Sequence, residues 1–419
     1  MMKKAKKLFQ LFFIFMLIST TFMFSGCKKN STEKQTITLG FLSWYNETTM
    51  DPVLKAFKKK NPNIKIDLQY APPIQNYIQK FQVLYSSNSL PDIFVTSAEN
   101  KNDVMNNKMA KDLTSLPNVA NLSEANKKTY TDDNGKLIAF APDGWFAGIF
   151  VNKTLLREKG LNVPANYSEY IAAMRTLKSK GIEPWAFSST NLYDPLQGYV
   201  ETETISKDAD YDKKVDSGKL KYKDGWTVPI QKWYDDYVKT GYANKADLGI
   251  TGDQAMQEWA TGKAAFTVGA TWNPVSVAKL NPKLDYTLLP WFGTDNKTTY
   301  LTGAAGVGWS INSKTTHSDE AMTFLKYLTS NEGIQLFEGK ANGVVAVKGI
   351  DYTIDAHLKD CYPYFTSGKI YLPAVSWKYS DALGDILLKY SQNIVGGSAK
   401  PEDLITAMDK KWTDLEAAS

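Results

Sequence analysis

From residue 37 onward, short apolar runs alternate with segments whose apolar residues recur at helical spacing. The runs at 37–42, 64–68 and 93–95 predict strands, and residues 53–60 and 77–85 predict the helices that connect them. A β-α-β order of this kind predicts parallel strand pairing in an α/β domain.

The stretch 135–160 organises the rest of the chain. Its pattern predicts a strand at 136–141, a second strand at 149–151 and a short helix at 154–159 that ends at Gly160. Pro142-Asp143-Gly144-Trp145 predicts a turn between the strands. Two interpretations fit: a crossing between two lobes with Trp145 on a cleft wall, or a strand-turn-strand in one domain with Trp145 in its core.

The remaining pattern alternates in the same way. Residues 204–226 are polar, and we expect them on the surface. The glycines at 303, 306 and 308 lack the spacing of a dinucleotide fingerprint, so we expect them to allow close passage of the backbone. We predict further strands at 183–187, 264–268, 286–289 and 343–348, and further helices at 170–178, 230–237, 254–261, 318–328, 382–394 and 401–415.

The N-terminus has the features of an export signal. Four lysines precede an apolar run at 8–24, which is short for a membrane span and ends in Ser25-Gly26-Cys27. This resembles a bacterial lipoprotein signal, with Phe24 where that motif usually has Leu. It predicts cleavage after residue 26, acylation (palmitate) of Cys27 and a tether at 27–36. Ordinary cleavage with Cys27 free, or a retained anchor, are the alternatives.

Charge and cysteine content exclude several classes of protein. Without residues 1–26 the chain keeps 45 basic and 44 acidic residues, a formal charge of +1, so the basic balance does not indicate nucleic-acid binding. Cys27 and Cys361 are the only cysteines, which excludes an intramolecular disulfide framework. His317 and His357 lack ligand spacing, so we expect no metal and no cofactor.

The 11 Trp and 23 Tyr residues admit two interpretations. They are core and surface aromatics, or some of them are stacking platforms for sugars. Trp44, Glu99 and Trp272 each follow a predicted strand, where open α/β sheets bind ligands. A chain of about 390 mature residues favours two domains.

Five sequence blocks occur in the order found in one family: GKLIAF…VNKTLLREKG, PDIF, TGKAAFTVGATW, GWSINSKTTHSDEAMTFLKYLTSNEG and GVVAVKG. Over residues 37–415 the chain resembles the carbohydrate-binding lipoproteins of ABC importers, the extracellular solute-binding family that includes maltose-binding protein. The resemblance implies an α/β fold of two lobes with a ligand cleft between them. Three hinge crossings are implied near 142–146, 300–303 and 343–349. The N-terminal lobe would comprise 37–142 plus 303–345, and the C-terminal lobe 146–300 plus 350–419.

The resemblance also implies ligand contacts. Trp272 and Trp377 match aromatics that stack on sugar, Tyr193 matches a sugar-contacting tyrosine, and Glu99 matches an acidic contact. Trp145 stands where the maltose binder has another acidic contact, and Thr96 replaces an aromatic. Loop position adds Trp44, Asn46 and Asp194. We expect a structural role for Trp185, Trp226, Trp233, Trp259, Trp291, Trp309 and Trp412.

The function implied by the resemblance is an extracellular lipoprotein, not an enzyme. It would bind an oligosaccharide by lobe closure and deliver it to the transmembrane subunits of an ABC permease. We expect a monomer, anchored through Cys27 on the outer face of a bacterial cell membrane. One alternative is a secreted glycoside hydrolase, which needs two placed carboxylates such as Glu99 and Asp194. Another is a binder of the same fold for a non-sugar solute or a sensor partner.

Overall fold

The N-terminal alternation of strand and helix builds a four-stranded sheet, the first sheet, in the order β10-β3-β1-β2. In the computed structural model, which describes residues 36–71, 74–341 and 343–418, β1 pairs in parallel with both β2 and β3, as predicted. β10 pairs antiparallel with β3. The strands are β1 (Ile37–Ser43), β2 (Ile64–Tyr70), β3 (Ile93–Thr96) and β10 (Gly308–Ile311). The predicted signal peptide, Cys27 and all but the last residue of the tether lie outside the described residues.

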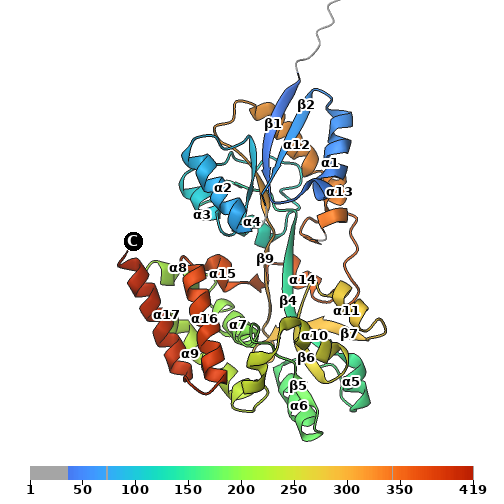
Figure 1. Cartoon of the computed structure of the whole chain (residues 1–419), viewed down its shortest axis with the longest axis vertical. Helices are drawn as coiled ribbons and strands as arrows, with labels where there is room; N and C mark the ends of the chain where they lie inside the picture. Colours follow the sequence, from blue (N-terminus) through green and yellow to red (C-terminus); the bar gives the residue numbers. More distant parts are fainter. Residues whose placement is uncertain (1–35, 72–73, 342, 419) are drawn as a thin grey trace, which may run out of the picture. The chain divides into compact units, whose positions relative to one another are not determined.

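Helices pack around the first sheet (Figure 1). In α1, Met50, Val53 and Phe57 recur three to four residues apart and are buried, and Asn46 caps the helix by accepting from the Thr49 amide. The prediction of a helix at 318–328 is confirmed by α12. These helices are α1 (Glu47–Lys60), α2 (Ile74–Ser86), α3 (Lys101–Asn106), α4 (Glu124–Tyr130), α12 (Ser318–Leu328) and α13 (Asn331–Ala341).

The stretch that organises the chain differs from its prediction. Residues 136–141 form isolated bridges rather than a strand, and the predicted turn at 142–145 is not formed. Instead β4 (Asp143–Asn152) is one continuous strand that contains Trp145. Its pairing partners decide this, because β9 (Thr299–Ala305) and β11 (Val344–Val345) both pair with its first residues.

A second, eight-stranded sheet is built around β4, with the path β12-β9-β4-β6-β5 and with β7, β8 and β11 attached. β6 and β7 correspond to the strands predicted at 264–268 and 286–289. Both pair antiparallel with β4. The further strands are β5 (Glu183–Trp185), β6 (Ala264–Ala270), β7 (Tyr286–Leu289), β8 (Trp291–Phe292) and β12 (Ile370–Tyr371).

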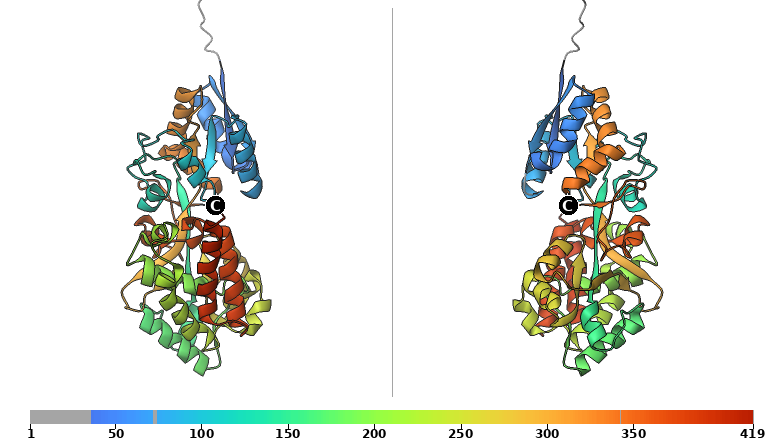
Figure 2. Two further views of the ribbon diagram at one scale, coloured as in Figure 1. Left: turned by 90° about the vertical axis from the view of Figure 1, so that its left-hand side faces the viewer. Right: turned by 90° about the vertical axis from the view of Figure 1, so that its right-hand side faces the viewer.

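Helices cover the second sheet, and α16 and α17 lie side by side (Figure 2). The expectation that residues 204–226 lie on the surface is wrong for their aromatic positions, since Tyr211, Tyr222 and Trp226 are buried. These elements are α5 (Lys153–Glu158), α6 (Tyr167–Ser179), α7 (Asp194–Val200), the π-helix η1 (Glu201–Ile205), α8 (Tyr211–Asp216), α9 (Tyr222–Trp233), the π-helix η2 (Tyr234–Val238), the 3₁₀-helix η3 (Lys245–Gly249), α10 (Gly252–Ala260), α11 (Pro274–Leu280), α14 (Tyr362–Thr366), α15 (Pro373–Ser376), α16 (Ser380–Val395) and α17 (Pro401–Glu416).

Three chain segments meet where β4 begins. The Asp143 carboxylate packs against Gly306, which follows β9, and Gly343, which precedes β11. A Cβ on Gly306 would lie 2.0 Å from Asp143 Oδ1, and one on Gly343 would lie 2.1 Å from Oδ2. The expectation that the glycine-rich stretch permits close backbone passage is therefore confirmed. These glycines let the connecting strands close around a buried carboxyl.

Candidate functional site

A cavity of about 820 Å³, the aromatic cavity, opens beside β4 and the helices of the second sheet. Five of the residues predicted for the ligand site line it: Trp145, Tyr193, Asp194, Trp272 and Trp377. They come from β4, the start of α7, the loop after β6 and the residue after α15. The fold thus brings together positions that are distant in the sequence.

Trp145 and Trp272 form the aromatic wall of this cavity. Their ring centroids lie 5.5 Å apart at 61°, an edge-to-face arrangement. Trp272 is held outward by its loop, because Asn273 Oδ1 accepts from the Ala270 amide at 2.8 Å and the Thr271 amide donates to Phe146 O at 3.0 Å. Its side chain is 62% exposed. An exposed indole on a cavity wall suits a ligand with an apolar face.

Polar groups from the start of α7 also line the aromatic cavity. Gln197 Nε2 donates to Asp194 Oδ1 at 3.1 Å. Burial raises the pKa of Asp194 to about 7, and the Gln197 hydrogen bond opposes this rise. Burial, followed by the negative charge of Asp194, raises the pKa of Tyr193 to about 12. A carboxylate, a carboxamide and a neutral phenol can together donate to and accept from several ligand hydroxyls.

The floor of the aromatic cavity includes Trp291 and Thr302. Trp291 Nε1 donates to Thr302 Oγ1 at 2.9 Å, and Thr302 Oγ1 donates to Glu201 Oε1 at 2.7 Å. The sequence interpretation missed Gln197 and Thr302 and gave Trp291 a structural role only. Trp291 is 3% exposed, so it is structural and also reaches the cavity. No local pattern signals these residues, because their place depends on contacts between separate elements.

Trp377 is less accessible than its prediction as a stacking platform implies. Its side chain is 5% exposed. The ring packs against Tyr222 at 5.3 Å and Trp226 at 5.4 Å. Only part of the indole therefore faces the aromatic cavity, and its contribution to ligand stacking stays a prediction.

Glu99, Trp44 and Asn46 are not among the described residues that line the aromatic cavity. They follow β1 and β3 of the first sheet. Glu99 is exposed, Trp44 is half-buried with its ring 6.0 Å from that of Tyr77, and Asn46 caps α1. Their roles stay predictions. The expected structural roles of Trp185, Trp226, Trp233, Trp259 and Trp309 agree with their burial, and Trp412 is half-buried.

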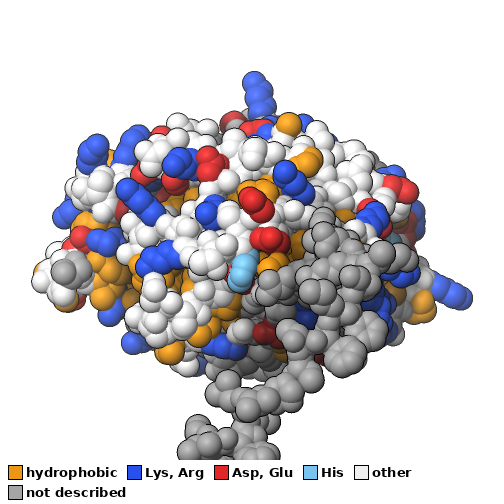
Figure 3. Space-filling model, turned by 90° about the horizontal axis from the view of Figure 1, so that it is seen from above, with side chains coloured by type: hydrophobic (Ala, Val, Ile, Leu, Met, Phe, Trp, Pro, Cys, Tyr) orange, Lys and Arg blue, Asp and Glu red, His pale blue; other side chains and the backbone are white. Residues whose placement is uncertain are grey.

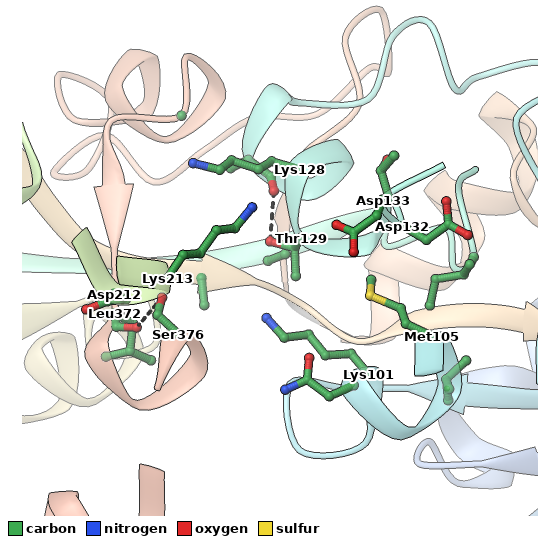
Figure 4. Close-up of a pocket in the computed structure, with 18 of the residues that line it drawn as sticks. Lys101, Met105, Lys128, Thr129, Asp132, Asp133, Asp212, Lys213, Leu372 and Ser376 are labelled. Atoms are coloured by element: carbon green, nitrogen blue, oxygen red, sulfur yellow. Dashed lines mark hydrogen bonds between the residues drawn. The ribbon is translucent and has the colours of Figure 1, made fainter. Parts of the chain in front are cut away.

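A second cavity of about 930 Å³, the charged cavity, runs along Gly303, Ala304 and Ala305 of β9. Figure 4 shows Lys128 and Lys213, from α4 and α8, extending into the same space, with Asp133 nearby. Tryptophan is not among the described residues that line it. Its aromatic residues are Tyr300, which is half-buried, and Tyr371, which is buried and whose hydroxyl donates to Asp212 at 2.6 Å. Stacking chemistry therefore favours the aromatic cavity as the ligand site.

On the face shown in Figure 3, basic and acidic side chains are interspersed. Within the described residues, His, Cys, Asp and Glu side chains nowhere gather in threes with the spacing of a metal site.

Comparison with known proteins identifies the family and the fold of this chain. Residues 44–335 match the family model described as bacterial extracellular solute-binding protein. The chain is 24% identical to the multiple sugar-binding protein of Streptococcus mutans, over 79% of this chain and 81% of that one. It is 22% identical to the melibiose/raffinose/stachyose-binding protein MelE of Bacillus subtilis, over 97% of both. The structure resembles a family 1 extracellular solute-binding protein from Bifidobacterium longum subsp. infantis, with TM-score 0.82 and 24% identity, covering 91% of this chain and 100% of that one.

Proposed function

This chain belongs to the family of bacterial extracellular solute-binding proteins, and from that membership we propose that it binds an oligosaccharide in the aromatic cavity and delivers it to an ABC importer. The observation that carries the proposal is the exposed indole of Trp272, set edge-to-face to Trp145 in a cavity that the polar start of α7 also lines. Sugars present weakly apolar C–H faces and many hydroxyls, so one wall would stack and the other would form hydrogen bonds. The names of the two relatives support a sugar ligand.

Delivery would use closure of the two lobes over the ligand. In this proposal the N-terminal lobe comprises 37–142 plus 303–345, and the C-terminal lobe 146–300 plus 350–419. β4 and β9, which pair through Trp145 and Ala304, would form the hinge. Closure would bring the first sheet's Trp44, Asn46 and Glu99 to the ligand and present both lobes to the permease subunits.

We propose that the protein is a monomeric lipoprotein held on the outer face of the membrane by acylated Cys27. The support is the sequence pattern that ends at Cys27. In the part of the chain that the structure describes, every helix is too short or too polar to cross a bilayer.

In this proposal the protein binds the sugar and does not catalyse a reaction on it. A glycoside hydrolase requires two carboxyl groups on either side of the scissile bond. Of the nominated pair, Asp194 lines the aromatic cavity, whereas Glu99 is not among its lining residues and would reach the ligand only through the proposed closure. The assay for cleaved sugar described below therefore decides between binding and hydrolysis.

Calorimetric titration tests this proposal. Residues 28–419, which include the whole structural unit Ile37–Ser419, are titrated with melibiose, raffinose, stachyose, maltotriose, xylotriose and chitotriose, and each mixture is then analysed for cleaved sugar. We expect one-to-one binding of at least one oligosaccharide, which is recovered intact. Cleavage would revive the hydrolase, and no binding to any of the six sugars would overturn the carbohydrate assignment.

A further inference from the structure

A fully buried carboxyl lies beneath the floor of the aromatic cavity. Glu201 has no exposed surface. Its Oε1 accepts the Thr302 hydroxyl at 2.7 Å, and its Oε2 has no hydrogen-bond partner among the described residues. Burying a carboxyl with an unpaired oxygen is costly, and an apolar side chain of the same size would serve packing better. We therefore expect Glu201 to have a role other than packing.

Glu201 follows the cavity-lining residues of α7 along the chain. Asp194 and Gln197 line the cavity from the first turns of that helix, and Glu201 begins η1 where α7 ends. Single π-turns of this kind often occur at functional sites. The same helix holds Trp291 in place, because a Cβ on Gly198 would lie 2.5 Å from Trp291 Cγ. Glu201, Trp291 and the polar cavity wall thus depend on one helix.

The chemistry of the indole fixes the direction of the first hydrogen bond between these residues. An indole N–H can only donate, so Thr302 Oγ1 accepts from Trp291. Burial raises the pKa of Glu201 well above its ordinary value, and its Oε1 accepts the Thr302 hydroxyl when the carboxyl is ionised or holds its proton on Oε2. When the Thr302 hydroxyl donates to Glu201, it uses its only proton there and one lone pair on Trp291. What remains is one lone pair, on a residue that lines the cavity.

We propose that Glu201 is a positioning residue of the ligand site: by taking the Thr302 proton it makes that hydroxyl an acceptor for a sugar hydroxyl, and through Thr302 it fixes the indole of Trp291. This inference rests on the proposed function and adds a specificity to it. At the position of Thr302 the ligand must present a hydrogen-bond donor.

The test is a double-mutant cycle between Glu201 and Thr302. Glu201→Leu, Thr302→Val, the double variant and Glu201→Gln are titrated with the same six sugars, and the melting temperature of each is recorded. We expect Glu201→Leu and Thr302→Val each to weaken binding about tenfold, the loss of one hydrogen bond. The double variant should bind no more weakly than Thr302→Val alone, because Glu201 acts through Thr302. Glu201→Gln, whose amide oxygen accepts the same proton, should stay within about threefold of the wild type.

Glu203→Gln is the matched control. Glu203 belongs to the same π-helix, but its carboxylate bonds Thr294 and Lys207, outside the cavity floor, so this variant should bind sugar like the wild type. If folded Glu201→Leu binds with wild-type affinity, or if the two losses multiply in the double variant, Glu201 has no positioning role. If Glu201→Leu fails to fold, wild-type affinity in Thr302→Val overturns the inference and a tenfold loss supports it. A wild type that binds none of the sugars fails at the proposed function itself.

Discussion

Replacing Trp272 with alanine removes the most exposed ring of the aromatic cavity. The indole is 62% exposed, so of about 250 Å² of tryptophan side chain roughly 150 Å² is free for contact. A sugar stacked on one face would cover about half of that, ~75 Å². At about 25 cal/mol per Å² this contact contributes about 2 kcal/mol, roughly 25-fold in Kd. The free energy of unfolding should change by less than about 0.5 kcal/mol, because little of the ring is buried in the absence of ligand.

Calorimetry with the six sugars measures the affinity, and a thermal scan measures the stability. Val228→Ala is the control, because Val228 is 67% exposed on α9 and is not among the residues lining the aromatic cavity. We expect the control to bind like the wild type and Trp272→Ala to lose at least tenfold. A folded Trp272→Ala variant with wild-type affinity would remove Trp272 from the site.

Three further predictions concern titratable and modified groups. Because the pKa of Asp194 is raised to about 7, its carboxylate becomes a stronger acceptor as pH rises through neutrality, so wild-type sugar affinity should increase between about pH 5.5 and 8. Titrations of Asp194→Asn should show no such increase; a slope that persists there belongs to another group. Burial raises the pKa of Asp143 to about 7, above about 3.9 when unfolded, so its stabilising contribution is complete below about pH 4 and is lost as pH rises through 7. Asp143→Asn lacks this loss, and its melting temperature relative to wild type should climb between about pH 4 and 7; a constant difference would refute the assignment. Cys27→Ala should move the protein from the membrane fraction to the medium, and continued membrane attachment would contradict a lipid anchor at Cys27.

The pattern of apolar and polar residues predicted those elements that are determined by neighbouring residues in the sequence. The 318–328 helix has its bounds as predicted, since its buried face and its ends depend on neighbouring residues. The pattern failed at 136–146, where strand pairing decides. Asp143 and Gly144 have turn chemistry, yet β11 and β9 pair with them and extend β4 to Asp143. The pattern failed again at 204–226. This segment is polar in overall composition, but the rings of Tyr211 and Trp226 within it are buried.

The order of residues was enough to indicate an α/β chain of two domains and, through the resemblance to the solute-binding family, two lobes and the nomination of Trp145, Trp272 and Asp194 for the site. Those residues could be found because they stand at strand ends or in motifs that short stretches reveal. The positions of Trp291 and Thr302 on the cavity floor, and of Glu201 beneath them, are determined by the packing of the folded chain and could not be predicted from the sequence. The bond between Glu201 and Thr302 joins residues 101 positions apart, and a buried carboxyl is tolerated only where a distant donor meets it. No local spacing encodes such a meeting, because it depends on how η1 packs against β9.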